Sequence, residues 1–383
     1  MDSGSLGDIK NSVNLFRGDV YLPLKLVSLT GRNGLDVEIS AFYGSNIHTQ
    51  VQTRNMTAPT DLLGVGWAIP FEKIAVDTKN TSTGYDNDFY LVGGGQTILL
   101  YRTGTKGKAI AFQAKYYQFW EILYYPNDLH PEQGRWEIVK EDGSTYTYGS
   151  RTNGIQWGVD WNHWIGSSAN PSGKQYPVSW NLVQVKNRWG DTLRFEYESD
   201  NVGIGGSSTA KYTRASRLKT ITDVYGQTIT FYYEQKQPYE IQLPHVPPQQ
   251  GYPNAYQFQY EEKFLDRIEV NNEKGGLLFK TLFHYDFYNV APSPRHNDDN
   301  YKKRYLTGVE QRNKDNEGLP GTIFNYYIDP GDINPGAIKS ITYPGGGIAL
   351  YTYETQELTD SSTRREIESP GQGYKPRVWY GPD

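Results

Sequence analysis

Apolar and polar residues alternate with a period of two along much of the chain. Between residues 35 and 43, the side chains of Leu35, Val37, Ile39 and Ala41 fall on one face of an extended strand. At residues 136–149, two runs of this kind flank an Asp-Gly pair, which supplies the positive φ that tight hairpin turns require. No long stretch rich in Ala, Leu, Glu and Lys predicts a lengthy helix. The pattern therefore predicts an all-β protein.

One hairpin pattern recurs after residue 181. Each unit has the form apolar-x-x-apolar, then a turn, then apolar-x-aromatic-x-Tyr. The units open at Leu182, Leu218, Leu265, Leu306 and Ile338, and their second strands end at Tyr197, Tyr233, Tyr285, Tyr326 and Tyr353. Glycines in the turns and in an earlier Gly-x-Gly-Trp element complete the candidate structural residues, namely Gly66, Trp67, Gly190, Gly226 and Gly346. One hairpin cannot bury its apolar face, so we expect successive antiparallel hairpins to form a curved ribbon or partial shell.

Composition supports a repeated β architecture. The 383 residues include 32 Tyr, 14 Phe and 9 Trp, which suit strands, and 40 Gly and 21 Pro, which suit turns. We expect a flexible leader at 1–15 and an N-terminal β region at 16–180 with a Trp-rich insertion. Hairpin repeats at 181–383 are expected to continue from this region without a break.

Charge and cysteine content exclude several functional classes. The formal net charge is −5 and no basic stripe is visible, which argues against nucleic-acid binding. The short runs Lys302-Lys303-Arg304 and Arg364-Arg365 are expected to be solvated loop or edge-strand charges. Cysteine is absent, so disulfides and thiolate chemistry are excluded. No apolar run is long enough for a transmembrane helix, and the first residues lack the features of a secretory signal.

Few residues suggest chemistry. Trp157, Asp160, Trp161 and Trp164 could offer aromatic platforms and a carboxylate to a sugar, but the pattern favours tryptophans that fill a small core of the insertion. No histidine pair has zinc-helix spacing and no Gly-x-Ser-x-Gly elbow occurs. We therefore predict no catalytic residue, no metal site and no cofactor.

The hairpin units resemble the YD, or RHS, repeats of bacterial polymorphic toxins. The stretch 35–43, followed by Gly64-Val65-Gly66-Trp67, resembles the opening of SpvB-type proteins and of insecticidal toxin-complex B subunits. Segments 305–309 and 343–354 resemble recurrent segments of the same proteins. The resemblance implies repeats that wind into a hollow β-shell enclosing a cytotoxic segment. A section of this length is expected to form only an open arc.

These observations favour a non-catalytic scaffold or shell component of a bacterial toxin-like system. Its partners would be other protein segments or subunits of a toxin assembly, and it would be secreted or associated with the cell surface. The alternative is a carbohydrate-binding or cell-surface adhesion module that uses exposed Trp and Tyr side chains, with a glycan as its partner. An enzyme ranks third.

Overall fold

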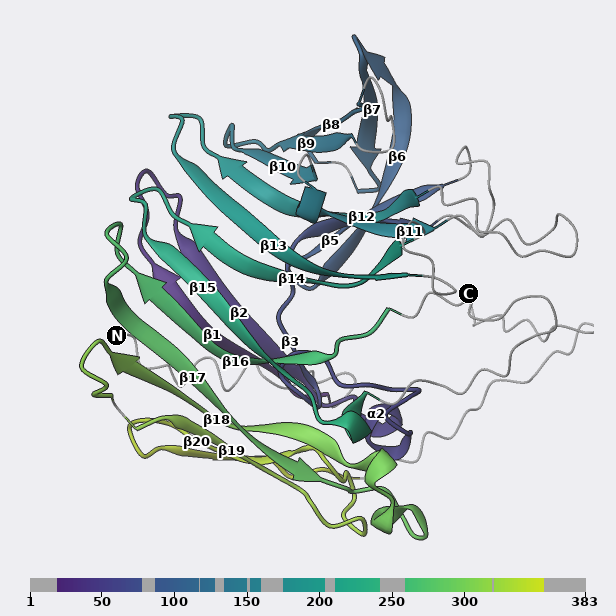
Figure 1. The fold of residues 1–383 in the computed structure, drawn as a ribbon, viewed down its shortest axis with the longest axis vertical. Coiled ribbons are helices and arrows are strands. Elements are labelled where there is room, and N and C mark those ends of the chain that lie inside the picture. The colour runs from purple at the N-terminus through teal and green to yellow at the C-terminus, as the bar shows by residue number, and fades with distance from the viewer. Residues whose placement is uncertain are drawn as a thin grey trace, which may run out of the picture.

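The structure is a computed structural model, and it is built almost entirely of β-strands (Figure 1). It describes residues 19–77, 87–116, 118–127, 134–149, 152–159, 175–203, 211–241, 259–318 and 320–354. Its helical elements are short: α2 (His48–Gln52), η2 (Thr152–Gly154), η4 (Pro238–Glu240), η5 (Arg295–Asn297) and η6 (Asp299–Tyr301). None of the helices in these ranges is long and apolar enough to cross a membrane.

Three parts make up the fold, and the first is a small sheet near the N-terminus. Its order is β1-β2-β3, all antiparallel, with β1 (Tyr21–Leu29), β2 (Val37–Gly44) and β3 (Trp67–Ala68). In β2, every second residue from Val37 onward is buried and those between are exposed or half-buried, as period-two patterning predicts. We call this part the N-terminal sheet.

The second part is a closed barrel of eight strands. Its ring is made by β4 (Lys73–Asp77), β5 (Asp88–Gly93), β6 (Gln96–Lys106), β7 (Ala109–Ala114), β8 (Glu121–Tyr125), β9 (Arg135–Val139), β10 (Thr145–Gly149) and β12 (Gln175–Lys186). The ring closes because β12 pairs with both β10 and β4. An additional strand, β11 (Ile155–Val159), pairs with the first half of β12.

The third part, the ribbon, starts from the second half of β12. Each later strand pairs antiparallel with the one before it, and the ribbon passes from teal to yellow in Figure 1. The strands after β12 are β13 (Thr192–Gly203), β14 (Lys211–Thr222), β15 (Thr228–Gln235), β16 (Lys263–Asn271), β17 (Leu277–Tyr288), β18 (Lys303–Asn313), β19 (Thr322–Tyr326), β20 (Ile338–Thr342) and β21 (Ile348–Leu350).

The architecture confirms the all-β class and corrects the expected open arc. Successive antiparallel hairpins do form the ribbon, but β12 also belongs to the closed barrel, so the whole is not a simple open ribbon. The physical reason is a long-range pairing: Trp180 in β12 lies opposite Ile74 in β4. The expected boundary between the N-terminal region and the repeats, at residues 180 and 181, falls within β12.

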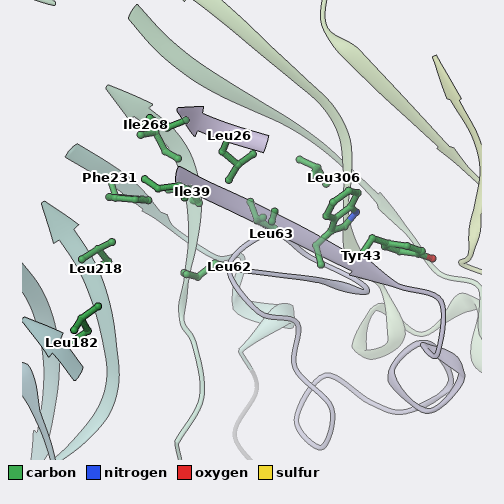
Figure 2. Close-up of a cluster of buried hydrophobic side chains, with 14 of the residues drawn as sticks. Leu26, Ile39, Tyr43, Leu62, Leu63, Leu182, Leu218, Phe231, Ile268 and Leu306 are labelled. Carbon is green, nitrogen blue, oxygen red and sulfur yellow. The ribbon is translucent and has the colours of Figure 1, made fainter. Parts of the chain in front are cut away.

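The N-terminal sheet packs on one face of the ribbon and shares its core (Figure 2). The backbone carbonyl of Leu26 in β1 accepts hydrogen bonds from Thr281 Oγ1 in β17 and from Gln311 Nε2 in β18, both at 3.0 Å. Tyr43 Oη in β2 accepts a hydrogen bond from the backbone N–H of Ile338 at 3.1 Å. Thus the chain's own N-terminus covers the apolar side of the ribbon.

Six turns along the described hairpins share one geometry. In the turn 187–191, the N–H of Gly190 donates to the carbonyl of Asn187, and the N–H of Asn187 donates to the carbonyl of Asp191. The same bonds recur in turns 140–144, 223–227, 272–276, 313–317 and 343–347. The fourth residue of each turn has a positive φ, which favours glycine or asparagine. These residues are Gly143, Gly190, Gly226, Gly275, Asn316 and Gly346.

Candidate functional site: a tyrosine belt and a buried charged edge

A row of tyrosines crosses the ribbon, and each bonds to the first strand of its own hairpin. Their hydroxyls donate to the backbone carbonyls of the residues that open the five repeat units. The pairs are Tyr197–Leu182 (2.8 Å), Tyr233–Leu218 (2.6 Å), Tyr285–Leu265, Tyr326–Leu306 (2.6 Å) and Tyr353–Ile338 (3.1 Å). We call this row the tyrosine belt.

Four of the five belt tyrosines also lie opposite the next hairpin. Tyr197 lies opposite Leu218, the residue that opens the following unit, and Tyr233 lies opposite Leu265 in the same way. The register shifts by one residue immediately before the tyrosine, at Glu196/Tyr197 and at Tyr232/Tyr233. The same arrangement recurs at Tyr285 and Tyr326. At four successive junctions, a tyrosine therefore pairs laterally with the next hairpin, while its hydroxyl bonds to the first strand of its own hairpin.

Burial keeps the belt hydroxyls protonated and able to donate. Loss of solvation raises the pKa of Tyr233 and of Tyr285 well above the ordinary value for a phenol. Burial raises the pKa of Tyr197 as well, and a nearby Glu72 carboxylate adds to the shift. These phenols thus act as fixed donors to backbone groups and do not exchange protons near neutral pH.

The Gly-x-Gly-Trp element anchors the N-terminal sheet to the tyrosine belt. Trp67 is buried, its indole N–H donates to Tyr326 Oη at 3.1 Å, and its ring meets Phe324 edge-on with centroids 5.0 Å apart. Gly66 has a φ of +75°, and a Cβ there would lie 2.5 Å from the ring of Tyr43. Only glycine fits this position without displacing the neighbouring ring.

Charged side chains cluster at the strand ends that lie opposite the hairpin turns. We call this cluster the charged edge. The centre is Arg217 in β14, whose side chain is 1% exposed. Its guanidinium donates to Glu261 at 2.6 Å, to Glu198 at 3.2 Å and to Asp200. Burial alone would lower the pKa of Arg217, but the hydrogen bonds to the carboxylates raise it. Burial raises the pKa of Glu261.

Two lysines of the charged edge hold the segment that precedes Gly66. Lys236 Nζ donates to the carbonyl of Thr60 and, at 2.9 Å, to that of Glu261. Lys303 Nζ donates to the carbonyl of Ala58 at 2.8 Å. Because burial disfavours the charged ammonium, the pKa of Lys236 falls to about 8 and that of Lys303 to about 7.

A buried ion pair completes the charged edge. Arg304 forms two hydrogen bonds with Glu240, at 3.1 and 2.8 Å, and both side chains are at most 4% exposed. The guanidinium carbon lies 3.7 Å from the centroid of the Phe264 ring and 4.7 Å from that of Phe287. The expectation that Lys303 and Arg304 are solvated charges is therefore wrong. Their partners, including Ala58 and Glu240, are distant in sequence and invisible to local patterning.

The candidate sugar-binding residues are only partly within the described chain. Trp157 lies in β11, where it is half-buried against the hydrophobic core and pairs laterally with Pro177. Asp160, Trp161 and Trp164 lie outside the described residues.

The turn glycines Gly190, Gly226 and Gly346 have φ values between +81° and +94°. The sequence pattern gives no sign of the charged edge, because its members come from strands β13, β14 and β18 and from the segments that follow β15 and precede β16.

The geometry of the charged edge suits anchoring more than reaction chemistry. Its shifted groups are engaged by carbonyls or by opposite charges: Lys236 and Lys303 by backbone oxygens, Arg217 by three carboxylates. Among the described residues, no group of three His, Asp or Glu side chains lies close enough together to hold a metal ion.

A shallow cavity of about 440 Å³ near η5 and η6 is lined by polar and apolar side chains, including His296, Asp299 and Lys302.

Comparisons with known proteins place the fold. No protein-family model matches the chain. In sequence, it is 22% identical over 377 residues to Salivary gland surface protein 1 of Aedes aegypti, an alignment that covers 96% of this chain and 10% of that protein. The chain thus spans about a tenth of the length of this curated relative.

Toxin-complex structures share the fold. A TcdB2-TccC3 crystal structure matches with a TM-score of 0.53 and 13% identity over 85% of this chain and 16% of that chain. The Photorhabdus luminescens Tc holotoxin pore matches with a TM-score of 0.50 and 15% identity over 81% of this chain and 16% of that chain. The N-terminal domain of the effector SpvB from Salmonella typhimurium, at a TM-score of 0.49 and 14% identity, covers 76% of this chain. The expected resemblance is confirmed at the level of fold: this chain has the fold of a section of the toxin-complex proteins.

Proposed function

We propose that the chain is a non-catalytic scaffold section, part of the β-shell of a toxin-like assembly. The observation that carries this proposal is the tyrosine belt. Each belt hydroxyl bonds to the first strand of its own hairpin, and four of the five tyrosines also pair laterally with the next hairpin, so the ribbon is a continuous wall. The fold shared with a section of the Photorhabdus luminescens Tc holotoxin pore supports the same role, because that structure is a toxin assembly.

The covered face of the ribbon limits what this section does alone. The N-terminal sheet occupies the apolar side of the ribbon through Leu26, Tyr43 and Trp67. Because its apolar face is already covered by the N-terminal sheet, this section by itself does not enclose another segment on that face. Its role in the proposal is to build and stiffen an assembly whose other parts are further protein segments or subunits.

We also propose that the protein acts outside the cell, secreted or at the cell surface. The name of the mosquito relative, Salivary gland surface protein 1, supports this location. Brief protease treatment of intact cells carrying the full-length tagged protein tests it. The tag should be cleaved or found in the medium, whereas full protection until lysis would contradict this placement.

Limited proteolysis of the full-length protein tests the scaffold role. We expect strands β12–β21 to resist cleavage together with the segments that they support. A variant with Tyr197→Phe, Tyr285→Phe and Tyr326→Phe should lose this protection across the assembly, while Tyr101→Phe, which changes an exposed tyrosine in β6, should keep it. If the triple variant kept its protection from cleavage, the tyrosine belt would not be what stabilises the section. A folded triple variant that loses an enzymatic activity would instead indicate a catalytic protein.

A further inference from the structure

Two aromatic side chains stand in solvent on neighbouring turns of the ribbon. Trp189 in turn 187–191 is 58% exposed and Tyr225 in turn 223–227 is 50% exposed. Each is the third residue of its turn, and neither belongs to the hydrophobic core. The equivalent residues of the other four described turns are Asp142, Lys274, Asp315 and Gly345. Since the same turn forms with charged or small residues, its geometry does not require an aromatic ring.

A third turn brings an arginine to the Trp189 turn. Arg32, in the turn between β1 and β2, donates to Asp191 Oδ1 from Nε at 2.8 Å and from Nη2, and Asn33 Nδ2 donates to Asp191 Oδ2 at 2.8 Å. The Tyr225 turn lies at the same end of the ribbon, because it follows β14, which pairs with β13 of the Trp189 hairpin. The Arg32 side chain is still 57% exposed. Arg32 therefore lies against the Trp189 turn and remains accessible to solvent.

The backbone that carries both rings is held in place before any ligand arrives. Asn187 Oδ1 accepts the N–H of Trp189 at 3.0 Å, and Asp223 Oδ1 accepts the N–H of Tyr225 at 2.8 Å. The guanidinium of Arg188 lies 4.1 Å from the centroid of the Trp189 ring. A turn whose backbone is already fixed loses little conformational entropy on binding, which favours affinity.

Size and charge indicate the kind of ligand. The apolar patch on these turns is confined to two rings, whereas a stable protein interface buries about 800 Å² on each partner. Charged residues border it on both sides, with Glu141 in one adjacent turn and Glu273 in the other. A small flat patch of this kind fits sugar rings, whose C–H faces stack on aromatic side chains. Guanidinium groups beside the rings favour carboxylates, which they bind through paired hydrogen bonds.

We propose that Trp189, Tyr225, Arg32 and Arg188 form a platform that binds an acidic oligosaccharide. The two rings stack on sugar faces, and the two guanidinium groups bind the sugar carboxylates. This site is on the turn edge, away from Trp157 and the charged edge. It is independent of the scaffold role, so failure of one does not imply failure of the other.

Calorimetric titration of the full chain with defined sugars tests the platform. The probes are sialyllactose and a heparin-derived tetrasaccharide, with neutral cellotetraose for comparison. We expect the acidic probes to bind and cellotetraose to fail. The double variant Trp189→Ala, Tyr225→Ala and the single variant Arg188→Gln should each weaken binding by roughly tenfold or more, a loss of about 1.4 kcal/mol. Tyr101→Ala, which removes another exposed ring (48% exposed), should bind like the unmodified chain.

Three results would overturn the proposal. The first is no heat of binding with either acidic probe, and the second is equal binding by the double variant. The third is concentration-dependent self-association, measured by analytical ultracentrifugation, that disappears in the double variant, because the patch would then be a protein interface. Circular dichroism spectra and melting temperatures of all variants establish that each has folded, which the exposure of the substituted side chains favours.

Discussion

Single hydroxyl groups carry much of the organisation of the ribbon. Tyr197 makes one buried hydrogen bond through its hydroxyl, to the carbonyl of Leu182. Tyr326 makes two, because its hydroxyl donates to the carbonyl of Leu306 and accepts from the Trp67 indole. Removing a buried partner costs more than a hydrogen bond normally contributes, since the remaining group is left desolvated and unpaired.

Substitution of these tyrosines by phenylalanine should therefore show a graded loss of stability. We expect Tyr197→Phe to lower the free energy of unfolding by about 1 kcal/mol, and Tyr326→Phe by about 2 to 3 kcal/mol, because the latter leaves two groups unpaired. Urea unfolding followed by fluorescence measures both. The exposed Tyr101→Phe serves as control and should change stability by less than about 0.5 kcal/mol. Equal values for the three variants would contradict the assigned hydrogen bonds.

The ion pair between Arg304 and Glu240 depends on both members because water cannot replace either one. Glu240→Ala would leave the Arg304 guanidinium buried and uncompensated, so we expect a loss of about 3 to 5 kcal/mol in unfolding free energy. Asp315→Ala removes an acid from the exposed pair with Lys314 and should cost less than about 1 kcal/mol. Chemical denaturation of the two variants compares them, and similar small losses would show that the buried pair is solvated in solution.

The hairpin turns set the geometry of the elements. Gly226 has a φ of +81°, and a Cβ there would meet only ordinary contact with Glu273 at 3.5 Å. The cost of a substitution is therefore conformational, not steric. The equivalent position in turn 313–317 is Asn316, with a φ of +65°.

This comparison predicts the order of stability among variants of Gly226. Gly226→Val should lose more than about 1 kcal/mol, because a β-branched residue tolerates positive φ poorly. Gly226→Asn should lose clearly less, since asparagine already occupies the equivalent position elsewhere in the chain. Thermal unfolding with matched heating rates ranks the two, and a Gly226→Asn variant as unstable as Gly226→Val would refute the conformational explanation.

Local patterning predicts the hairpins well because their partners are close in sequence. Strands β13 and β15, which contain Tyr197 and Tyr233, pair with neighbours across short turns, so alternation and a turn residue suffice to place them. The hydroxyl partners of these tyrosines are 15 residues away and could not be read from alternation alone. Barrel closure was missed for the same reason at longer range, because Trp180 pairs with Ile74.

Long-range contacts also explain the misjudged charges. Lys303 contacts Ala58 across 245 residues, and Arg304 contacts Glu240 across 64. A short basic run in a sequence carries no sign of such partners, so its members resemble solvated side chains. Aromatic exposure was equally hidden: Trp157, the candidate for stacking on sugars, is half-buried against the core, whereas Trp189 is 58% exposed.

At the scale of the whole molecule, the buried lysines link stability to pH. The pKa is about 7 for Lys303 and about 8 for Lys236 in the folded chain, while 10.5 is the ordinary value for lysine. Between these values, the unfolded chain binds protons that the folded chain does not. The free energy of unfolding should therefore rise as pH increases through this window, and the contribution is lost as pH falls through the folded values.

Urea unfolding at pH 7 and pH 9.5 measures this dependence. We expect the unmodified chain to be more stable at pH 9.5, and Lys303→Met to show a smaller rise because one of the two titrating groups is gone. Lys314→Met, at a side chain 68% exposed, should keep the full rise. Equal stability at the two pH values, or an unchanged rise in Lys303→Met, would contradict the assigned burial.

The central claim is that the ribbon is a wall section of a larger β-shell. Electron cryo-microscopy of the full-length protein that contains this chain tests it most directly. The account predicts that β12–β21 lie in a continuous curved wall, with the N-terminal sheet against one face and neighbouring segments joined to the ribbon. A map in which this section is a separate domain on a linker, sharing no sheet or packed surface with the rest of the protein, would contradict it.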